Sequence, residues 1–238
     1  MTDFFSTTQN WDLYSQENHE TWEILFQACR EKASLHMCSD FLQGLTVLDL
    51  PSDRIPSLND LSDRLKSISG WEIIPVPALV PDDVYFGLMA EKKFPINVNI
   101  RGINEIDFVE FPDLFHDIFG HIPLLIAPKI ESFIQHCGAL IKDAILSKSL
   151  SKLNQAKRLY WYTMEVGFVR ENDEVKILGS AIASSTKEIT RSLTVSPRRF
   201  TLDDVTNTPF DITAVQQTYF CLDDISVLGT IRSAQAVA

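Results

Sequence analysis

The chain has 238 residues, of which 45% are apolar, and a formal net charge of −11 at pH 7. This length and composition are those of an ordinary globular domain, which buries roughly 70 to 75% of the unfolded chain's surface without disulfide or metal staples. The acidic charge is repelled by phosphate backbones and anionic lipids, so we expect no nucleic-acid partner and no membrane partner.

Two further features of the sequence bear on location. The N-terminal residues lack a basic region followed by an apolar run, and no apolar stretch of about 18 residues occurs. The four cysteines are scattered without a C-x-x-C pair, in a chain too large to need disulfides. We predict reduced thiols in a cytoplasmic protein. Cys137 lies on the apolar face of a predicted helix and is expected to pack in the protein core.

The first third of the chain, up to about Gly70, is predicted to be helical. Apolar residues recur with helical spacing over 22–29, 41–48 and 58–65, with a break near Ser39, and Gly70 ends the third helix. Residues 71–79 are predicted to be extended and irregular, because prolines remove backbone donors and disfavour helical geometry in the residue before them.

The remaining two thirds contain a mixture of helices and short strands. The expected elements are a helix over 81–89, a strand and turn over 94–106, helices over 131–148 and 152–164, a hairpin of 166–169 with 175–178, and a helix over 185–193 that begins with a capping box at Ser185. No repeat, low-complexity tract or linker interrupts them. The sequence therefore predicts one domain, residues 1–238, that is mainly α with small β elements.

The segment FPDLFHDIFGHIP at 111–123 carries the strongest chemical signal. Asp113 is a good N-cap, which places His116 in the first turn of a short helix. Five residues of regular α-helix rotate a side chain by about 500°, so His116 and His121 would point about 140° apart. A regular helix would keep the two imidazoles from meeting.

Gly120 and Pro123 are expected to change that geometry. A glycine that ends the helix can adopt a positive φ and turn His121 back, while Pro123 prevents the helix from continuing. Two converging histidines suggest a zinc or iron site. The H-x-x-x-x-H spacing also fits core or surface histidines that bind no metal, so a third ligand is needed.

Glu165 is the best candidate for that third ligand. It ends the apolar and aromatic run YWYTM, where a buried carboxylate would need a cation because its desolvation costs several kcal/mol. A solvent-facing glutamate on an aromatic helix is the alternative. Two histidines and one carboxylate are the ligands of non-haem iron(II) oxygenases, whereas the H-E-x-x-H motif of many zinc hydrolases is absent.

Several motifs in order make the chain resemble a known family. It is similar to the catalytic domain of the pterin-dependent aromatic amino acid hydroxylases, especially the short bacterial phenylalanine hydroxylases, over roughly residues 11–228. The matching motifs are FLQGLTVLDLPSDRIPSL at 41–58, GWEIIPVPALVPDD at 70–83, PDLFHDIFGHIPLL at 112–125, YWYTMEVGF at 160–168 and LGSAIASSTKE at 178–188.

This resemblance implies a monooxygenase that uses O2 to hydroxylate the ring of an aromatic amino acid, with Fe(II) and tetrahydrobiopterin as cofactors. It implies that the catalytic metal ligands are His116, His121 and Glu165. The pterin site would be made of Ala78, Leu79, Val80, Tyr85, Asp117 and Tyr160. The substrate site would be made of Arg101, which binds the carboxylate; Asp113, which holds Arg101; Pro112 and Trp161, which line the ring pocket; and Ser184, which supports His116.

Two of these assignments have structural alternatives. The proline-rich segment before Val80 can be a structural corner without a ligand, and Arg101 can form a plain surface ion pair. Two alternative functions remain open. The chain can be a hydrolase that uses the same three metal ligands, or a non-catalytic relative that keeps the fold. At this length we expect neither the regulatory domain nor the tetramerisation helix of the animal enzymes, and hence a monomer or a weak dimer.

The chain departs from the family pattern where specificity is decided. Asp117 stands where Glu is usual, Ala78 where Gly is usual, and Val109, Val166 and Ala181 where Thr, Phe and Gly are usual. Trp161 is typical of phenylalanine and tyrosine hydroxylases, and Cys221 replaces an acidic residue of tyrosine hydroxylases. Phenylalanine is the expected substrate, with tryptophan or tyrosine as alternatives because Val166 leaves extra space.

Overall fold

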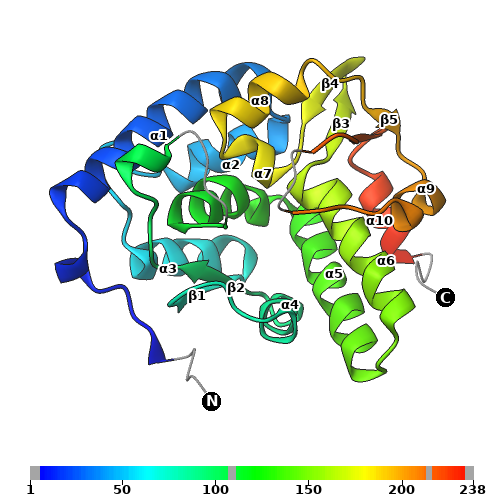
Figure 1. Cartoon of the computed structure of the whole chain (residues 1–238), viewed down its shortest axis with the longest axis horizontal. Helices are drawn as coiled ribbons and strands as arrows, with labels where there is room; N and C mark the ends of the chain where they lie inside the picture. The colour runs from blue at the N-terminus through cyan, green and yellow to red at the C-terminus, as the bar shows by residue number, and fades with distance from the viewer. Residues whose placement is uncertain (1–5, 107–110, 213–215, 234–238) are drawn as a thin grey trace.

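The computed structural model describes residues 6–106, 111–212 and 216–233 (Figure 1). Its α-helices are α1 (Gln16–His36), α2 (Ser39–Leu48), α3 (Leu58–Ser69), α4 (Asp82–Ala90), α5 (Pro128–Leu146), α6 (Leu150–Tyr160), α7 (Ser180–Ala183), α8 (Thr186–Ser192), α9 (Leu202–Asn207) and α10 (Val227–Ser233). Its strands are β1 (Glu72–Val76), β2 (Lys93–Asn97), β3 (Phe168–Glu171), β4 (Glu174–Ile177), β5 (Arg198–Arg199) and β6 (Phe220–Leu222). Short 3-10 helices are η2 (Trp11–Leu13), η3 (Ile103–Glu105) and η5 (Ile122–Ile126), and π-helices are η4 (His116–His121) and η6 (Trp161–Glu165).

The three predicted N-terminal helices are confirmed as α1, α2 and α3. Local capping explains their ends: Ser15 and Asn18 form a capping box at the start of α1, and Gly70 ends α3 in the left-handed region with φ 77°. Their buried faces carry the apolar residues whose helical spacing predicted them. The mainly α fold class is therefore confirmed.

The extended segment after Gly70 is more regular than predicted. Residues 72–76 form β1, which pairs in parallel with β2 in a two-stranded sheet, Ile73 opposite Phe94. Pro75 is tolerated because each strand of a two-stranded sheet has a free edge toward which a residue without an N–H can face. The pairing of β1 with β2 joins the segment before α4 to the segment after it.

The middle of the chain is a helical block beside this sheet. Figure 1 shows α5 and α6 side by side, and α4 also packs closely on α5. Gly138 permits the second contact, since a Cβ there would lie 2.6 Å from the Ala90 nitrogen. The predicted helix over 152–164 is split: α6 ends at Tyr160, and the next five residues form the π-helix η6.

The C-terminal third adds a small sheet in the order β4-β3-β6-β5. The predicted hairpin is confirmed as β3 and β4, with Asn172 and Asp173 at positive φ in its turn. The helix predicted from Ser185 is α8, and the Ser185 hydroxyl accepts from the Glu188 N–H. The sequence analysis missed α7, α9, α10, β5 and β6, which are short and depend on packing rather than on local pattern.

One continuous hydrophobic cluster runs through the described residues, from Trp22 in α1 to Ile231 in α10. Its centre is aromatic: Phe119 of η4 packs against Phe26, Phe41 and Phe115. These ring contacts pack η4 against α1 and α2. None of the helices in the described ranges is both long and apolar enough to traverse a bilayer.

Candidate active site

The two histidines and the glutamate singled out from the sequence lie on two separate π-helices. His116 and His121 are the first and last residues of η4, and Glu165 is the last residue of η6. In a π-helix the N–H of residue i+5 bonds to the carbonyl of residue i, so side chains five residues apart lie nearly over one another. This wider turn brings the two imidazoles to the same face.

The prediction that Gly120 turns His121 back through a positive φ is wrong. Among the described glycines only Gly70 has a positive φ, so Gly120 does not turn the chain back. It is needed for close approach, because a Cβ at Gly120 would lie 2.8 Å from the carbonyl oxygen of Ser180. Pro123 does not end the helical path either, since the chain continues as the 3-10 helix η5.

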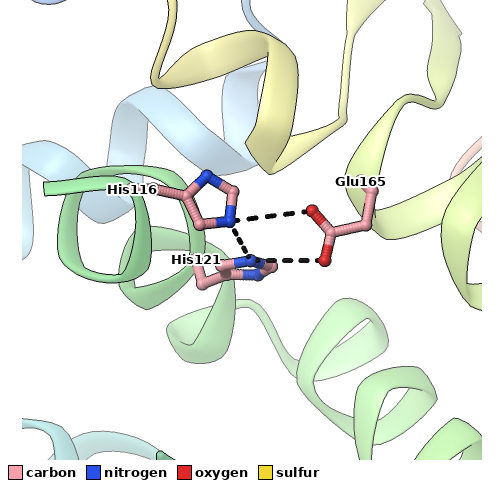
Figure 2. Close-up of side chains that lie close together, drawn as sticks. All are labelled: His116, His121 and Glu165. Carbon is pink, nitrogen blue, oxygen red and sulfur yellow. Dashed lines mark hydrogen bonds and ion pairs between the residues drawn. The ribbon is translucent and has the colours of Figure 1, made fainter. Parts of the chain in front are cut away.

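The three side chains point toward one another (Figure 2). The Nε2 atoms of His116 and His121 are 3.1 Å apart. Glu165 places Oε1 3.4 Å from His121 Nε2 and Oε2 3.9 Å from His116 Nε2. Metal–ligand bonds of about 2.1 Å at right angles separate neighbouring ligand atoms by about 3 Å. The spacing of these side chains is that of a three-ligand face on one metal ion.

The electrostatics of the triad fit a divalent cation. Burial lowers the pKa of His116 to about 4, helped by His121, and lowers that of His121 to about 3, so both rings are neutral ligands at pH 7. Burial also raises the pKa of Glu165 against the opposing pull of His116. A cation between the three groups would relieve this cost.

His116 is oriented by Ser184, as the sequence analysis expected. The Ser184 hydroxyl lies 2.9 Å from His116 Nδ1 and donates its own hydrogen to the carbonyl of Ser180. Its oxygen therefore accepts from Nδ1–H, which leaves Nε2 with a free lone pair toward Glu165. The contact selects the tautomer that can bind a metal.

Arg101 and Asp113 form a buried ion pair, not the surface pair that was the alternative. Arg101 donates from Nε and Nη2 to the two carboxylate oxygens of Asp113, both at 2.8 Å, and the side chains are 3% and 6% exposed. Asp113 also accepts from the His116 N–H at 3.0 Å. Burial would raise the pKa of Asp113, but Arg101 and these N–H donors hold it below its ordinary value. The carboxylate thus binds the backbone N–H of the first residue of η4 and holds Arg101 at the same time.

The residues expected at a pterin site occupy two environments. Tyr160 is buried and Tyr85 is partly buried. Burial raises the pKa of both hydroxyls, and the charge of Glu165 adds a smaller contribution. Burial also raises the pKa of Asp117, which accepts from the Asn97 N–H at 2.8 Å. Val80 is buried, whereas Ala78 and Leu79 are exposed at the end of the segment after β1.

The expected substrate-pocket residues lie on or just before the two π-helices. Trp161 begins η6, and its ring stacks on Phe210 with centroids 4.9 Å apart. Its indole N–H donates to Gln216. Pro112 is exposed and lies four residues before the start of η4. Of the positions that depart from the family pattern, Val166 is buried, and Val109 lies outside the described residues.

Sequence reasoning missed two features of this site. Ser180 contacts Glu165 and His121. The ring centroids of Phe94 and His121 are 4.9 Å apart. Ser180 belongs to the motif LGSAIASSTKE, in which the sequence analysis assigned a role to Ser184 but none to Ser180. Neither contact follows from spacing along the chain, because each joins elements that are far apart in sequence.

The chain is similar to known proteins of one family. The profile of a family described as biopterin-dependent aromatic amino acid hydroxylase matches residues 11–231. A phenylalanine-4-hydroxylase of Chromobacterium violaceum is 37% identical over 227 residues, which is 94% of this chain and 75% of the relative. One of Caulobacter vibrioides is 37% identical over 234 residues, 96% of this chain and 79% of the relative.

Solved structures show the same similarity. The crystal structure of the Chromobacterium violaceum phenylalanine hydroxylase, with bound iron(III) and oxidised cofactor 7,8-dihydrobiopterin, matches with a TM-score of 0.90 at 36% identity, covering 99% of this chain and 86% of that chain. The apo structure of the cold active phenylalanine hydroxylase from Colwellia psychrerythraea matches with a TM-score of 0.89 at 33% identity, covering 97% and 89%.

Proposed function

Because the chain belongs to the biopterin-dependent aromatic amino acid hydroxylases, we propose that it converts phenylalanine to tyrosine with O2 and a tetrahydrobiopterin, using iron(II). One oxygen atom of O2 enters the substrate ring and the other leaves on the pterin, which ends as a hydroxypterin. The observation that carries the proposal is the convergence of His116, His121 and Glu165. Phenylalanine is supported by the names of the relatives at 37% identity.

The metal would be held by the Nε2 atoms of His116 and His121 and by the carboxylate of Glu165. Bound iron supplies the activation of O2, with its remaining positions open to the reactants. The protein keeps the two imidazoles neutral by burial and orients His116 through Ser184. It thereby provides a preformed set of ligands.

The amino acid substrate would be held at two ends. Arg101 binds the substrate carboxylate while its Nε and Nη2 stay on Asp113, since a guanidinium offers five N–H donors in a rigid fork. Trp161 and Pro112 line the pocket for the ring. The stack of Trp161 on Phe210 fixes the indole plane against which an aromatic ring can pack.

The pterin would lie beside the metal. Tyr85 offers the ring for stacking; Asp117 and Tyr160 offer polar contacts; and the segment of Ala78, Leu79 and Val80 offers its backbone. Burial raises the pKa of both tyrosine hydroxyls, and the smaller influences of each on the other and of Glu165 on both support a position of both rings near the metal ligands. We also infer a cytoplasmic location, because the four cysteines are buried free thiols.

The proposal is tested by hydroxylation assays on purified protein loaded anaerobically with iron(II). Phenylalanine, tyrosine and tryptophan are supplied in separate reactions with tetrahydrobiopterin and O2. We expect tyrosine from phenylalanine at the highest rate, with none when the pterin or O2 is left out. A faster reaction of tryptophan would identify tryptophan as the preferred substrate, with its larger ring in the space beside Val166. No product from any of the three, with iron bound at one per chain, would contradict the proposal.

A further inference from the structure

Ser180 is a fully buried hydroxyl that touches the candidate metal ligands and has no role in the function proposed above. It is 0% exposed. Its Oγ lies 2.8 Å from Oε2 of Glu165, 2.9 Å from the carbonyl oxygen of Met164 and 3.1 Å from Nε2 of His121. A single side chain from α7 therefore meets ligand atoms of both π-helices.

The position of Ser180 is set by backbone packing rather than by its own side chain. A Cβ at Gly179 would lie 2.2 Å from the carbonyl oxygen of Glu165, and one at Gly120 would lie 2.8 Å from the carbonyl oxygen of Ser180. The first turn of α7 is thus pressed between η4 and η6. Because the backbones of these segments lie in close contact on both sides of α7, the Ser180 hydroxyl is held close to Glu165 and His121.

A hydroxyl carries one hydrogen, so its strongest acceptor decides what it does. The ionised carboxylate is that acceptor, since hydrogen bonds to a charged group are roughly twice as strong as neutral ones. With Oε2 held by Ser180, the other oxygen of Glu165 faces His121 at 3.4 Å. The carboxylate is then presented with Oε1 toward the metal position.

We propose that Ser180 is a positioning residue for the metal-binding carboxylate: its hydroxyl fixes the rotamer of Glu165 and so raises the affinity of the site for divalent metal. This inference rests on the proposed function, because it takes His116, His121 and Glu165 as the ligands. Together with Ser184, one turn later, Ser180 makes α7 a two-serine support, in which Ser184 holds His116 and Ser180 holds Glu165.

The test is metal affinity of Ser180→Ala, measured with Co(II) by competition against a chromophoric chelator. Loss of a hydrogen bond to a metal ligand typically costs 10- to 100-fold in affinity, so we expect Co(II) to bind at least about tenfold more weakly. The visible spectrum of bound Co(II) should also change, because a freed carboxylate alters the coordination. Ser192→Ala is the matched control: Ser192 is also 0% exposed, but its hydroxyl bonds only to the nearby Ile189 carbonyl among the described contacts.

The outcomes separate this inference from the function beneath it. If the wild-type protein fails to bind Co(II) or iron(II), the proposed function itself is wrong. If the wild type binds and Ser180→Ala binds within twofold with the same spectrum, Ser180 does not position the carboxylate. Tighter binding by Ser180→Ala would mean that the hydroxyl competes for His121, which also overturns the proposal. Equal weakening in Ser192→Ala would show a general packing effect and would do the same.

Discussion

Glu165 is a carboxylate buried against two imidazoles that are neutral at pH 7, because burial lowers their pKa values to about 4 and about 3. Such an arrangement costs the metal-free protein stability, since the carboxylate loses its hydration without gaining a counter-charge. Ser180 and Ser184 contact the candidate ligands at this site. A bound metal ion would offset the desolvation of the carboxylate by supplying the missing positive charge.

Glu165→Ala is therefore expected to abolish stoichiometric iron(II) binding while leaving the fold intact. The substitution removes one of three ligands but also removes a desolvated charge, so stability of the metal-free protein should be unchanged or slightly higher. Iron content after anaerobic reconstitution, together with far-UV circular dichroism, measures both effects. Glu174→Ala, at an exposed glutamate of β4, is the control. Wild-type iron content in Glu165→Ala would show that the ligand assignment is wrong.

The ion pair of Arg101 and Asp113 predicts a pH dependence of stability. The pKa of Asp113 is lower in the folded chain than its ordinary value, so the pair stabilises fully above about pH 4 and loses its contribution as the pH falls through the folded value. Asp113→Asn should destabilise the protein by about 3–5 kcal/mol near neutral pH, since it leaves a buried guanidinium unpaired.

Urea unfolding at steps from about pH 7 down to about pH 3 tests this expectation. The gap in unfolding free energy between wild type and Asp113→Asn should narrow below about pH 4. Asp223→Asn is the control, because Asp223 forms an exposed pair with Arg199 and should change stability little at any pH. A gap that stays constant down to the lowest pH would mean that the charge of Asp113 is not what stabilises the pair.

Among the elements, the two π-helices are what bring the ligands together. Regular α-helical geometry would point His116 and His121 about 140° apart, whereas η4 places their Nε2 atoms 3.1 Å from each other. The π-helix η6 likewise ends on Glu165. Both are held by the short helix α7, whose glycine contacts replace the side chains that would separate the segments.

A series of glycine substitutions tests this packing. Gly179→Ala places a Cβ 2.2 Å from a backbone oxygen, Gly120→Ala places one 2.8 Å from a backbone oxygen, and Gly87→Ala in α4 meets nothing within 4 Å. We expect Gly179→Ala to lower the unfolding free energy most, by about 1–3 kcal/mol or more, and Gly120→Ala to follow. Gly87→Ala should be neutral or stabilising by up to about 1 kcal/mol. Equal effects at all three positions in urea unfolding would contradict the packing argument.

For the whole molecule, one hydrophobic cluster joins the N-terminal helices to α10. We therefore expect the metal-free protein to unfold as a single domain. Tryptophan fluorescence reports on Trp11, Trp22 and Trp71 in the N-terminal half and on Trp161 in η6. It should give the same urea midpoint as far-UV circular dichroism. Two separated transitions would show that the chain divides into units that fold independently.

The surface charge predicts the state of association. A net charge of −11 opposes self-association of identical chains, and the exposed large apolar side chains of the described residues come from elements spread from η2 to α8 and beyond. We expect light scattering after size exclusion to give the 27.0 kDa mass of one chain. A mass of twice that value at micromolar concentration would identify a stable dimer instead.

What the sequence determined by itself was local or chemical in kind. Apolar spacing, caps such as Ser185 and the terminating Gly70 predicted α1, α2, α3, α5, the hairpin and α8, because these signals act within a few residues. The candidate ligands also followed from the chain, because residue chemistry alone points to His116, His121 and Glu165.

Tertiary structure alone decided how these pieces meet. No local signal specifies a π-helix in place of an α-helix, since the wider turn of η4 is stabilised by packing of Phe119 on α1 and α2 and by α7 against Gly120. The contacts of Ser180 with Glu165 and His121 likewise join segments 15 and 59 residues apart. Such contacts depend on the closed fold, because the free energy that holds them comes from burial of surfaces contributed by the whole chain.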